Sequence, residues 1–419
     1  MGSTEVIDLE AAATASVSEK AVRYSYRLRV SGLAEHLLVE EWDAKRWVWN
    51  RCVEASRTAH QESTPDKKMT CGPAELDRML TGWRAEHEWL GVKSSVVQQQ
   101  TIRDFAKARA KAMKDVSERL PQSQRRGMPR FKSKRRDQPS LSYTLRGFSL
   151  KDDTAGRARL RLAGKIVVRP VWSRPLPSSP TSVSVYRDAC GAWWCSFVVK
   201  VEPQPLSATG RNLGIDWGVK EVATTTDDDY DLPHPEHGKK AQKRLAKAQR
   251  RMARRKPAKG HSGSKGYQEA KTQTAKLHRK VARQRQDTGR KWAKRVVRGH
   301  DGIAAEDFRP KFLAKSTMAR KAADGAIAAT KNELVFMAGK HLRDLRLVPP
   351  AGTTMECSDC GAIAKHRLEL SERRYTCEAC GAVKPRDKNS AQVMLNRAGF
   401  HPVVSTDVRP EPSQRTQAA

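Results

Sequence analysis

The sequence predicts a multidomain protein of mixed α/β and β class. We expect an N-terminal small β-barrel with a helical insertion, followed by a C-terminal α/β domain with an inserted four-cysteine ribbon. Three observations support this prediction. Apolar and polar residues alternate through much of residues 140–202, which is typical of antiparallel strands. Short apolar runs and long basic helical patterns follow one another after residue 212. Two Cys-x-x-Cys pairs lie close together near the C-terminus.

The composition is strongly basic. The 419 residues, enough for two or three domains, include 80 Lys+Arg against 46 Asp+Glu, a formal net charge of +34. A compact chain with this excess repels itself unless a polyanion neutralises it, so DNA or RNA is the expected partner. A membrane surface is the competing interpretation, but no apolar run is long enough to span a bilayer. We therefore expect no membrane partner.

Residues 1–20 contain a single lysine and have neither the basic nor the apolar region of a signal peptide. We expect a bacterial-type cytoplasmic protein, associated with the nucleoid when it is bound to DNA. In a reducing compartment, eight cysteines are better explained by metal binding and packing than by disulfides. Four of them belong to no motif and are predicted to be packing residues: Cys52, Cys71, Cys190 and Cys195.

The N-terminal half begins with an alternating segment, residues 21–30, which predicts a strand with one basic face. The next segment is a helix whose apolar stripe includes Leu38, Trp42, Trp49 and Val53. We interpret its tryptophans as core residues, with stacking on bases as the alternative. A second helix is expected from Pro73, a favourable first-turn residue. A third follows Ser94–Ser95, with apolar residues at helical spacing: Ile102, Phe105, Met113, Val116 and Leu120.

These helices form a predicted insertion at residues 33–120. The basic loop at residues 125–136 is either a solvated linker or a phosphate contact, and its charge density favours the contact. Four strands should then complete a barrel built from residues 21–32 and 121–208. They are expected around two turns: 159–162 and 165–169 about Gly164, then 181–186 and 193–201 about Asp188–Gly191.

The C-terminal half alternates short strands and helices. The predicted strands are residues 212–216, 221–226, 230–232, 302–305 and 345–348. The predicted helices are residues 242–298, broken near 257–266, then 317–342 and 389–398.

Residues 239–256 contain ten Lys/Arg in eighteen positions and no acid. A solvated basic run is the simplest explanation. However, Leu245 and Met252 recur at helical spacing, so we favour a helical pair laid along a nucleic-acid backbone. The cations that we predict to bind nucleic acid, in this segment and in the basic loop, are Arg130, Lys132, Arg244, Arg250, Arg251, Arg254 and Arg255.

The cysteine pairs Cys357/Cys360 and Cys377/Cys380 are separated by sixteen residues, and a glycine follows each pair. Glycine lets the backbone turn so that its N–H groups face the sulfurs. This spacing predicts a tetrahedral structural zinc site. The alternative is two redox-active dithiols. That alternative would require the two Cys-x-x-Cys-Gly segments to match by chance. With four thiolate ligands the zinc has no open position and should not be catalytic.

Three acidic residues have similar settings. Asp216 and Glu306 each end a short apolar run, and Asp387 follows the second cysteine pair. Each alone could be a helix cap or an ion-pair partner. A carboxylate at the end of a buried strand is unfavourable unless a cation meets it, so the three together predict one metal site. Hard oxygen ligands suit Mg²⁺, and two such ions can promote phosphodiester hydrolysis. We judge the acidic neighbours secondary: Asp227, Asp228, Asp229 and Asp307.

These motifs resemble the split RuvC-type, RNase H-like nuclease of TnpB proteins and of the miniature type V CRISPR effectors. The matching pieces, in the family's order, are Gly214–Gly218, Ile303–Asp307, the cysteine pairs and Arg386–Ala391. The resemblance covers about residues 21–398 and is looser in the first half. It implies a RuvC-like nuclease at residues 209–352 and 384–398, with a zinc ribbon at 353–383.

The same resemblance implies an RNA-guided DNA endonuclease. Asp216, Glu306 and Asp387 would be the catalytic magnesium ligands, with a structural zinc nearby. The partners would be a guide RNA and double-stranded target DNA, with a short duplex motif read by the N-terminal half. The family usually has an acid where this chain has Pro385, which motivates a second hypothesis: an RNA-guided, repressor-like DNA-binding protein with weak or no cleavage. A third is a zinc-ribbon, transposase-type DNA-binding protein that uses no RNA. Residues 1–20 and 399–419 are predicted to be disordered tails.

Overall fold

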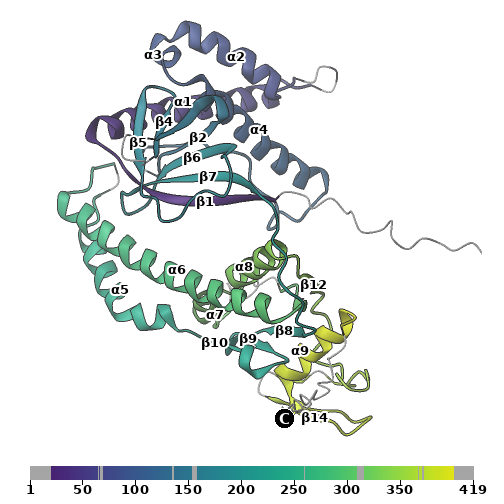
Figure 1. Cartoon of the computed structure of the whole chain (residues 1–419). Helices are drawn as coiled ribbons and strands as arrows, with labels where there is room; N and C mark the ends of the chain where they lie inside the picture. Colours follow the sequence, from purple (N-terminus) through teal and green to yellow (C-terminus); the bar gives the residue numbers. More distant parts are fainter. Residues whose placement is uncertain are drawn as a thin grey trace, which may run out of the picture. The chain divides into compact units, whose positions relative to one another are not determined.

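The computed structural model describes residues 20–64, 66, 69–134, 136–152, 158–258, 260–308, 316–366, 368–369 and 372–400. It divides into two compact units, Met1–Glu202 and Pro203–Ala419, each described below by itself. Figure 1 shows the elements of both. Apart from Lys20, Gly399 and Phe400, the two predicted tails lie outside the described residues.

The first unit contains a seven-stranded antiparallel sheet in the order β2-β6-β7-β1-β5-β4-β3. Its strands are β1 (Lys20–Arg29), β2 (Ser140–Thr144), β3 (Phe148–Asp152), β4 (Ala158–Leu162), β5 (Ile166–Pro170), β6 (Ser182–Arg187) and β7 (Trp193–Val201). Most of β1 pairs with β7, and its last two residues pair with β5, so β1 connects the two halves of the sheet. Among the described strands β2 and β3 are the two edges and do not pair with each other. The predicted barrel is therefore nearly, but not fully, closed.

The turns of this sheet lie where the sequence predicts them. Gly164 and Gly191 have φ of +87° and +80°, a conformation that glycine adopts without a Cβ penalty. Alternate side chains of the strands point inward and form one core, which α1 and α4 extend. Its fully buried members include Tyr26, Leu38, Leu141, Tyr143, Leu160, Ile166, Val185 and Phe197.

The α-helices described in the first unit are α1 (Gly32–Gln61), α2 (Pro73–Glu86), α3 (Glu88–Gly91) and α4 (Ser95–Ser117). The predicted stripe of α4 is only partly correct. Ile102 and Phe105 are buried, but Met113 and Val116 are exposed. Near its C-terminal end the buried residues are instead Ala112 and Asp115. There, Arg126 of the basic loop binds the buried Asp115 carboxylate.

Three of the four cysteines outside the motifs, Cys52, Cys71 and Cys195, are buried as predicted, whereas Cys190 is only half-buried. Cys190 lies in the turn between β6 and β7. There its N–H donates to the Asp188 carboxylate over 2.9 Å. Its environment is therefore set by a tight turn and not by core packing.

The second unit is built on a five-stranded sheet in the order β10-β9-β8-β11-β12. The strands are β8 (Asn212–Trp217), β9 (Glu221–Thr225), β10 (Leu232–Pro233), β11 (Gly302–Glu306) and β12 (Asp344–Val348). Strand β11 runs parallel to both β8 and β12, while β9 runs antiparallel to β8, the central strand. A separate two-stranded sheet pairs β13 (Arg374–Thr376) with β14 (Val383–Pro385).

The helices of this unit are α5 (His237–Arg254), α6 (Lys265–Gly299), α7 (Ala319–Gly325), α8 (Ile327–Lys340) and α9 (Arg386–Arg397). The predicted helical pair is present, since α5 and α6 lie side by side (Figure 1). The single helix predicted at residues 317–342 is wrong, because Ala326 adopts a left-handed conformation between α7 and α8. The last helix begins at Arg386, three residues earlier than predicted, so Asp387 lies within its first turn.

The two faces of β8 and β11 contact different helices. Leu213, Ile215 and Ile303 pack into a core with residues of α6 and α8. On the other face, Ala304 packs against Met394 and Leu395 of α9. Gly214, the partner of Ala304 in the sheet, faces α9 so closely that a Cβ there would lie 2.1 Å from the carbonyl oxygen of Ala391. The missing side chain of Gly214 therefore allows α9 to lie against β8.

We predict that Gly214→Ala displaces α9 and lowers the stability of the second unit. The contact is with backbone, so no side-chain rotation relieves it, and overpacking of this kind costs on the order of 1–3 kcal/mol. Urea unfolding followed by tryptophan fluorescence should show a lower midpoint. Gly82→Ala is the control, because an added Cβ at this exposed position in α2 meets nothing within 4 Å. An unchanged midpoint for Gly214→Ala would contradict this account of the packing.

Candidate metal centres and nucleic-acid surface

The fold brings the three predicted carboxylates to one end of the second sheet. β8 and β11 pair in parallel register as far as Ile215 and Ala305, so Asp216 and Glu306 follow directly at neighbouring strand ends. Asp216 is two residues beyond Gly214 and therefore shares the sheet face that α9 covers. Asp387 is one helical turn before Ala391, the residue of α9 that contacts Gly214.

The three carboxylates interact electrostatically. Burial raises the pKa of Asp216 well above its ordinary value, the negative charges of Glu306 and Asp387 raise it further, and Arg386 opposes the rise. Glu306 is 7% exposed. Burial raises its pKa to about 7, against the effects of a Trp217 N–H and of Lys331. A cation among these oxygens would offset both burial and mutual repulsion, so the donor set fits a hard divalent ion.

The carboxylate oxygens are not drawn tightly together. In the described part of the chain, the four cysteines of the two pairs form the group of three or more metal-ligating residues whose ligand atoms all lie within 4.8 Å of one another. At least one pair among the three carboxylates is therefore farther apart. Asp387 lies near two arginines, with its oxygens 3.9 Å from Nη1 of Arg373 and 3.6 Å from Nε of Arg386.

Arg386 lies next to the carboxylate cluster, and the sequence interpretation assigned it no role of its own. It is 9% exposed, and its Nη1 donates to the carbonyl oxygen of Glu369 over 2.8 Å. Within the described residues its Nε has no hydrogen-bond partner, although Asp387 is close. A buried cation thus adjoins the acidic cluster, where it limits the repulsion between carboxylates.

Lys388 and Asp231 were also missed, and they connect α9 to the sheet. The Lys388 ammonium donates to the carbonyl oxygen of Thr225 over 2.9 Å and to Asp231 over 2.8 Å, and it pairs with Asp228. Asp231 also accepts from the Thr225 N–H over 2.7 Å. The signal in the sequence is a lysine directly after Asp387 together with an acidic run at residues 227–231.

The secondary acids have distinct roles. Asp228 is a partner of Lys388, Asp227 pairs with Arg211, and Asp307 accepts from Lys331 over 2.9 Å. Asp229 is exposed. These contacts show Asp227, Asp228 and Asp307 in ion pairs around the cluster.

The cysteine cluster has the geometry of a tetrahedral metal site. The sulfurs of Cys357 and Cys380 are 3.7 Å apart, and those of Cys360 and Cys377 are 3.6 Å apart. Four thiolates around zinc at about 2.3 Å have sulfurs separated by roughly 3.8 Å, so the cluster fits zinc. Cys357 and Cys377 are buried, whereas Cys360 and Cys380 are exposed.

The two knuckles have the same backbone pattern. Gly361 donates to the carbonyl oxygen of Cys357 over 3.0 Å, and Gly381 donates to that of Cys377 over 2.9 Å. Both glycines have φ of +74°, which a residue with a side chain rarely adopts. Backbone N–H groups face the sulfurs, as predicted, and that of Cys380 helps to lower the pKa of Cys377 to about 7. A thiolate is favoured there without any nearby cationic side chain being required.

The basic loop of the first unit is clamped onto α1 and α4. Arg126 binds Asp115 through Nε and Nη2, over 2.9 and 2.8 Å. The Asn50 side chain bonds both backbone groups of Lys132, and the indole N–H of Trp49 donates to the carbonyl oxygen of Arg130 over 2.9 Å. The Lys132 ammonium lies 3.8 Å from the centre of the Trp49 ring, whereas Arg130 is exposed. Of the two predicted nucleic-acid residues, only Arg130 projects openly to solvent.

The basic face of α5 is open to solvent. Its residue buried in the described structure is Ala248, while Leu245 and Met252 are half-buried. The five predicted cations of this segment are all exposed: Arg244, Arg250, Arg251, Arg254 and Arg255. The sequence interpretation missed a second basic surface. It is a shallow depression between Tyr230 and α6, and the cations that line it all come from α6: Lys291, Lys294, Arg295 and Arg298.

Among the described helices, none combines the length and apolar character that crossing a bilayer requires.

We predict that the wild-type chain binds one zinc ion and that Cys377→Ser abolishes this binding, because the cluster would keep only three thiolates. Metal content measured by mass spectrometry after gel filtration tests the prediction. Cys190→Ser is the matched control, since Cys190 is outside the cluster and should leave the zinc content unchanged. Equal zinc in the Cys377→Ser and wild-type proteins would contradict the assignment.

We also predict that, in magnesium-free buffer, the second unit loses stability as the pH rises from about 4.5 to 7. The folded state raises the pKa of Glu306 from its ordinary 4.5 to about 7, so it holds a proton that the unfolded state has released. Glu306→Gln should remove this pH dependence and stabilise the protein at pH 7 by at most about 3 kcal/mol. Urea unfolding at several pH values is the measurement. A pH dependence unchanged by Glu306→Gln would refute the prediction.

Comparisons with known proteins place the chain in a family. A family profile described as probable transposase, OrfB_IS605, matches residues 196–317, and one described as the Cas12f1-like TNB domain matches residues 331–394. A putative RNA-guided DNA endonuclease of Streptomyces pristinaespiralis is 30% identical over 372 residues, which are 87% of this chain and 86% of the relative. The putative RNA-guided DNA endonuclease InsQ of Escherichia coli strain K12 is 26% identical over 422 residues, covering 94% and 98% of the two chains.

The fold is also known. A cryo-EM structure of a Cas12f1–sgRNA–target DNA complex matches with a TM-score of 0.51 and 14% identity, covering 90% of this chain and 98% of the other. The full-length similarity to the Streptomyces protein and the two matching profiles agree with the order of motifs in the sequence. This chain therefore belongs to the TnpB-like family of putative RNA-guided DNA endonucleases, which is related to the miniature CRISPR effectors.

Proposed function

We propose that this protein is an RNA-guided DNA endonuclease whose catalytic residues are Asp216, Glu306 and Asp387. The observation that carries the proposal is the convergence of these three acids, from β8, β11 and α9, at one end of a single sheet. Buried carboxylates with raised pKa values are typical of functional sites, because the fold gains nothing from bringing such charges together. The family relationship supplies the reaction class.

The three carboxylates would hold magnesium, which when bound can activate a water molecule and stabilise the leaving oxygen of a phosphodiester. The protein's own residues keep these ligands in place. Lys331 and the Trp217 N–H lower the energy of the charged Glu306, and the Trp217 indole donates to the carbonyl oxygen of Glu306 over 3.1 Å. Lys388 holds the first turn of α9 against β9. The cysteine site would thus hold zinc in a structural role, and the carboxylate site would hold magnesium for catalysis.

We further propose how the nucleic acids bind. The exposed arginines of α5 and the basic depression on α6 are suited to the phosphates of a guide RNA paired with its target. The barrel, residues 21–32 and 121–208, with its helical insertion, residues 33–120, would read a short motif in duplex DNA. Residues 209–352 and 384–398 would form a RuvC-like nuclease, with the zinc ribbon at residues 353–383.

Pro385, which motivates the hypothesis of an RNA-guided binder without cleavage, has a structural explanation. It ends β14, where it pairs with Arg374, and it is the residue that precedes the first turn of α9. Proline suits this place because the first N–H groups of a helix need no partner within it. Its side chain is exposed and is not one of the three carboxylate positions. We therefore favour the nuclease over the binder.

The test begins with the RNA. The full chain is purified together with the RNA that it retains, that RNA is sequenced, and a guide of new sequence is built on it. Plasmids with a matching target beside randomised flanking DNA are then incubated with the complex and Mg²⁺. We expect cutting that depends on the match, and a fall of about 100-fold or more for Asp216→Ala, since loss of a metal's outer-shell partner alone costs about 10–100-fold.

Asp229→Ala is the matched control, because Asp229 is an exposed acid of the same region and should cut normally. Equal cutting by the wild type and Asp216→Ala would overturn the assignment of the site. Specific binding of the target without cutting at any Mg²⁺ or Mn²⁺ concentration would select the repressor-like hypothesis. Recovery of no specific RNA would favour a zinc-ribbon DNA-binding protein that uses none.

A further inference from the structure

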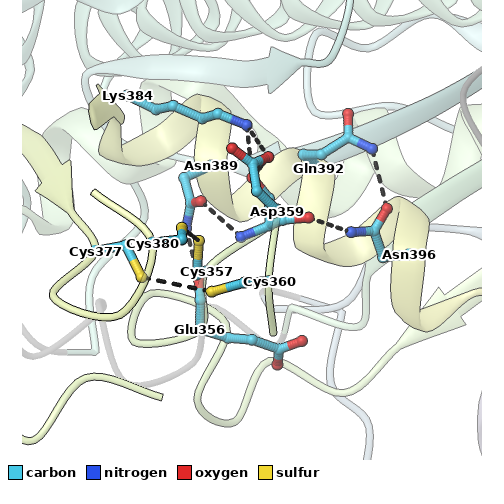
Figure 2. A network of polar contacts seen from close by, with 11 residues as sticks. Glu356, Cys357, Asp359, Cys360, Cys377, Cys380, Lys384, Asn389, Gln392 and Asn396 are labelled. Atoms are coloured by element: carbon cyan, nitrogen blue, oxygen red, sulfur yellow. Dashed lines mark hydrogen bonds and ion pairs between the residues drawn. The ribbon is translucent and has the colours of Figure 1, made fainter. Parts of the chain in front are cut away.

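The helix that carries Asp387 also holds the first cysteine knuckle. Asn389 is completely buried, and its side chain makes two hydrogen bonds to the knuckle backbone (Figure 2). Its Oδ1 accepts from the N–H of Ser358 over 3.0 Å, and its Nδ2 donates to the carbonyl oxygen of Glu356 over 2.7 Å. Glu356 and Ser358 are the two neighbours of Cys357. One amide side chain of α9 therefore holds the backbone on both sides of a predicted zinc ligand.

Two more side chains of α9 extend this contact. Asn396 donates to the carbonyl oxygen of Ser358 over 2.7 Å, and Arg397 donates through Nε to the Glu356 carboxylate over 2.8 Å. Figure 2 shows Asn389 and Asn396 directed at the same short segment. Asn389 is the central contact because it is fully buried, and removing its amide would leave two backbone groups without a partner. Each such group costs about 1–3 kcal/mol when it stays buried.

The opposite side of α9 is bound to the sheet. Lys388 bonds the carbonyl oxygen of Thr225, and Ala391 lies against Gly214. Asp387 is two residues before Asn389 and one helical turn before Ala391, so its neighbours in α9 contact both the knuckle and the sheet. A twelve-residue helix moves largely as a unit, so the knuckle on one side and the sheet on the other together determine where the Asp387 carboxylate lies.

From this arrangement we infer that Asn389 is a positioning residue, through which the metal-loaded cysteine knuckle holds α9 so that Asp387 stays beside Asp216 and Glu306. The zinc cluster then has a role inside the nuclease centre, although no cysteine touches a carboxylate of that centre. The knuckle keeps its shape only while the four sulfurs are bound together. Metal loss frees Glu356 and Ser358 to move, and Asn389 transmits that freedom to α9. The predicted effect on cleavage rests on the proposed nuclease function, whereas the contact between the knuckle and α9 does not.

Hydrogen exchange of the full chain, followed by mass spectrometry over residues 386–397, tests the connection without any need for activity. We expect exchange in this segment to rise about tenfold or more when zinc is removed by a chelator, and to rise similarly in zinc-loaded Asn389→Ala. The two changes should not add, because both break the same connection. Asp229→Ala is the control, since Asp229 is an exposed residue outside both α9 and the cysteine knuckles and should leave exchange unchanged.

Three results would overturn the inference: exchange in α9 that is indifferent to zinc, exchange that is indifferent to Asn389→Ala, or two effects that add in full. Asn389→Asp keeps the acceptor for Ser358 and loses the donor to Glu356, so it should give an intermediate rise. If Asn389→Ala fails to fold, Asn389→Asp carries the same comparison.

Cleavage supplies the second readout. We expect Asn389→Ala to need about tenfold more Mg²⁺ for half-maximal cutting, with unchanged affinity for target DNA, because a displaced Asp387 weakens metal binding and not nucleic-acid binding. A magnesium dependence equal to that of the wild type would count against positioning. If the wild type itself does not cut, the proposed function fails, while the exchange experiment still decides whether Asn389 couples the knuckle to α9.

Discussion

The second unit depends on the close approach of α9 to β8 at Gly214. The carbonyl oxygen of Ala391 lies only 2.1 Å from where a Cβ of residue 214 would be, so even alanine would force the helix away. Because of this contact, a residue from the C-terminal end of the chain reaches the ends of β8 and β11, the strands that carry Asp216 and Glu306. The opposite face of the same strands is buried against α6 and α8. Both faces of the sheet are therefore covered, which explains why β11 is buried at every position.

Charge is distributed unevenly in this chain. A formal net charge of +34 resides mainly on exposed surfaces, among them the arginines of α5. The C-terminal ends of β8 and β11 are instead acidic, and burial raises the pKa of both Asp216 and Glu306. Arg386 opposes the rise in the pKa of Asp216, and Lys331 opposes that of Glu306.

The first unit shows how a basic loop can present charge without being loose. Asp115 and Asn50, both on helices, bind the loop at Arg126 and Lys132, and the described residues of the loop belong to no helix or strand. Cations presented from a fixed backbone lose less conformational freedom on binding a phosphate than cations on a flexible linker. The loop therefore combines a structural role, in which Lys132 covers Trp49, with an exposed Arg130.

The amino-acid sequence by itself determined most of the local structure and supplied the four cysteines that cluster as candidate metal ligands. Strand alternation, Gly164 and Gly191 as turn residues, the interrupted basic helices and the matched cysteine knuckles all depend on short-range patterns, which one chain displays in full. The cysteine cluster was predictable because its spacing constrains the geometry. The exposure of Met113 and Val116 was not, because which side of α4 is buried depends on contacts outside the helix, such as that of Arg126 with Asp115.

Only the tertiary structure decided how the acids meet. Nothing in the local sequence shows that Ala391 lies on Gly214, that Lys388 reaches Asp231, or that Asn389 holds the backbone around Cys357. These contacts join residues far apart in sequence, and each depends on the packing of α9 as a whole. The spacing of the carboxylates and the arginines beside Asp387 follow from the same packing. The sequence shows which residue types could bind a metal. The distances between their side chains are set by the packing of α9 against the sheet.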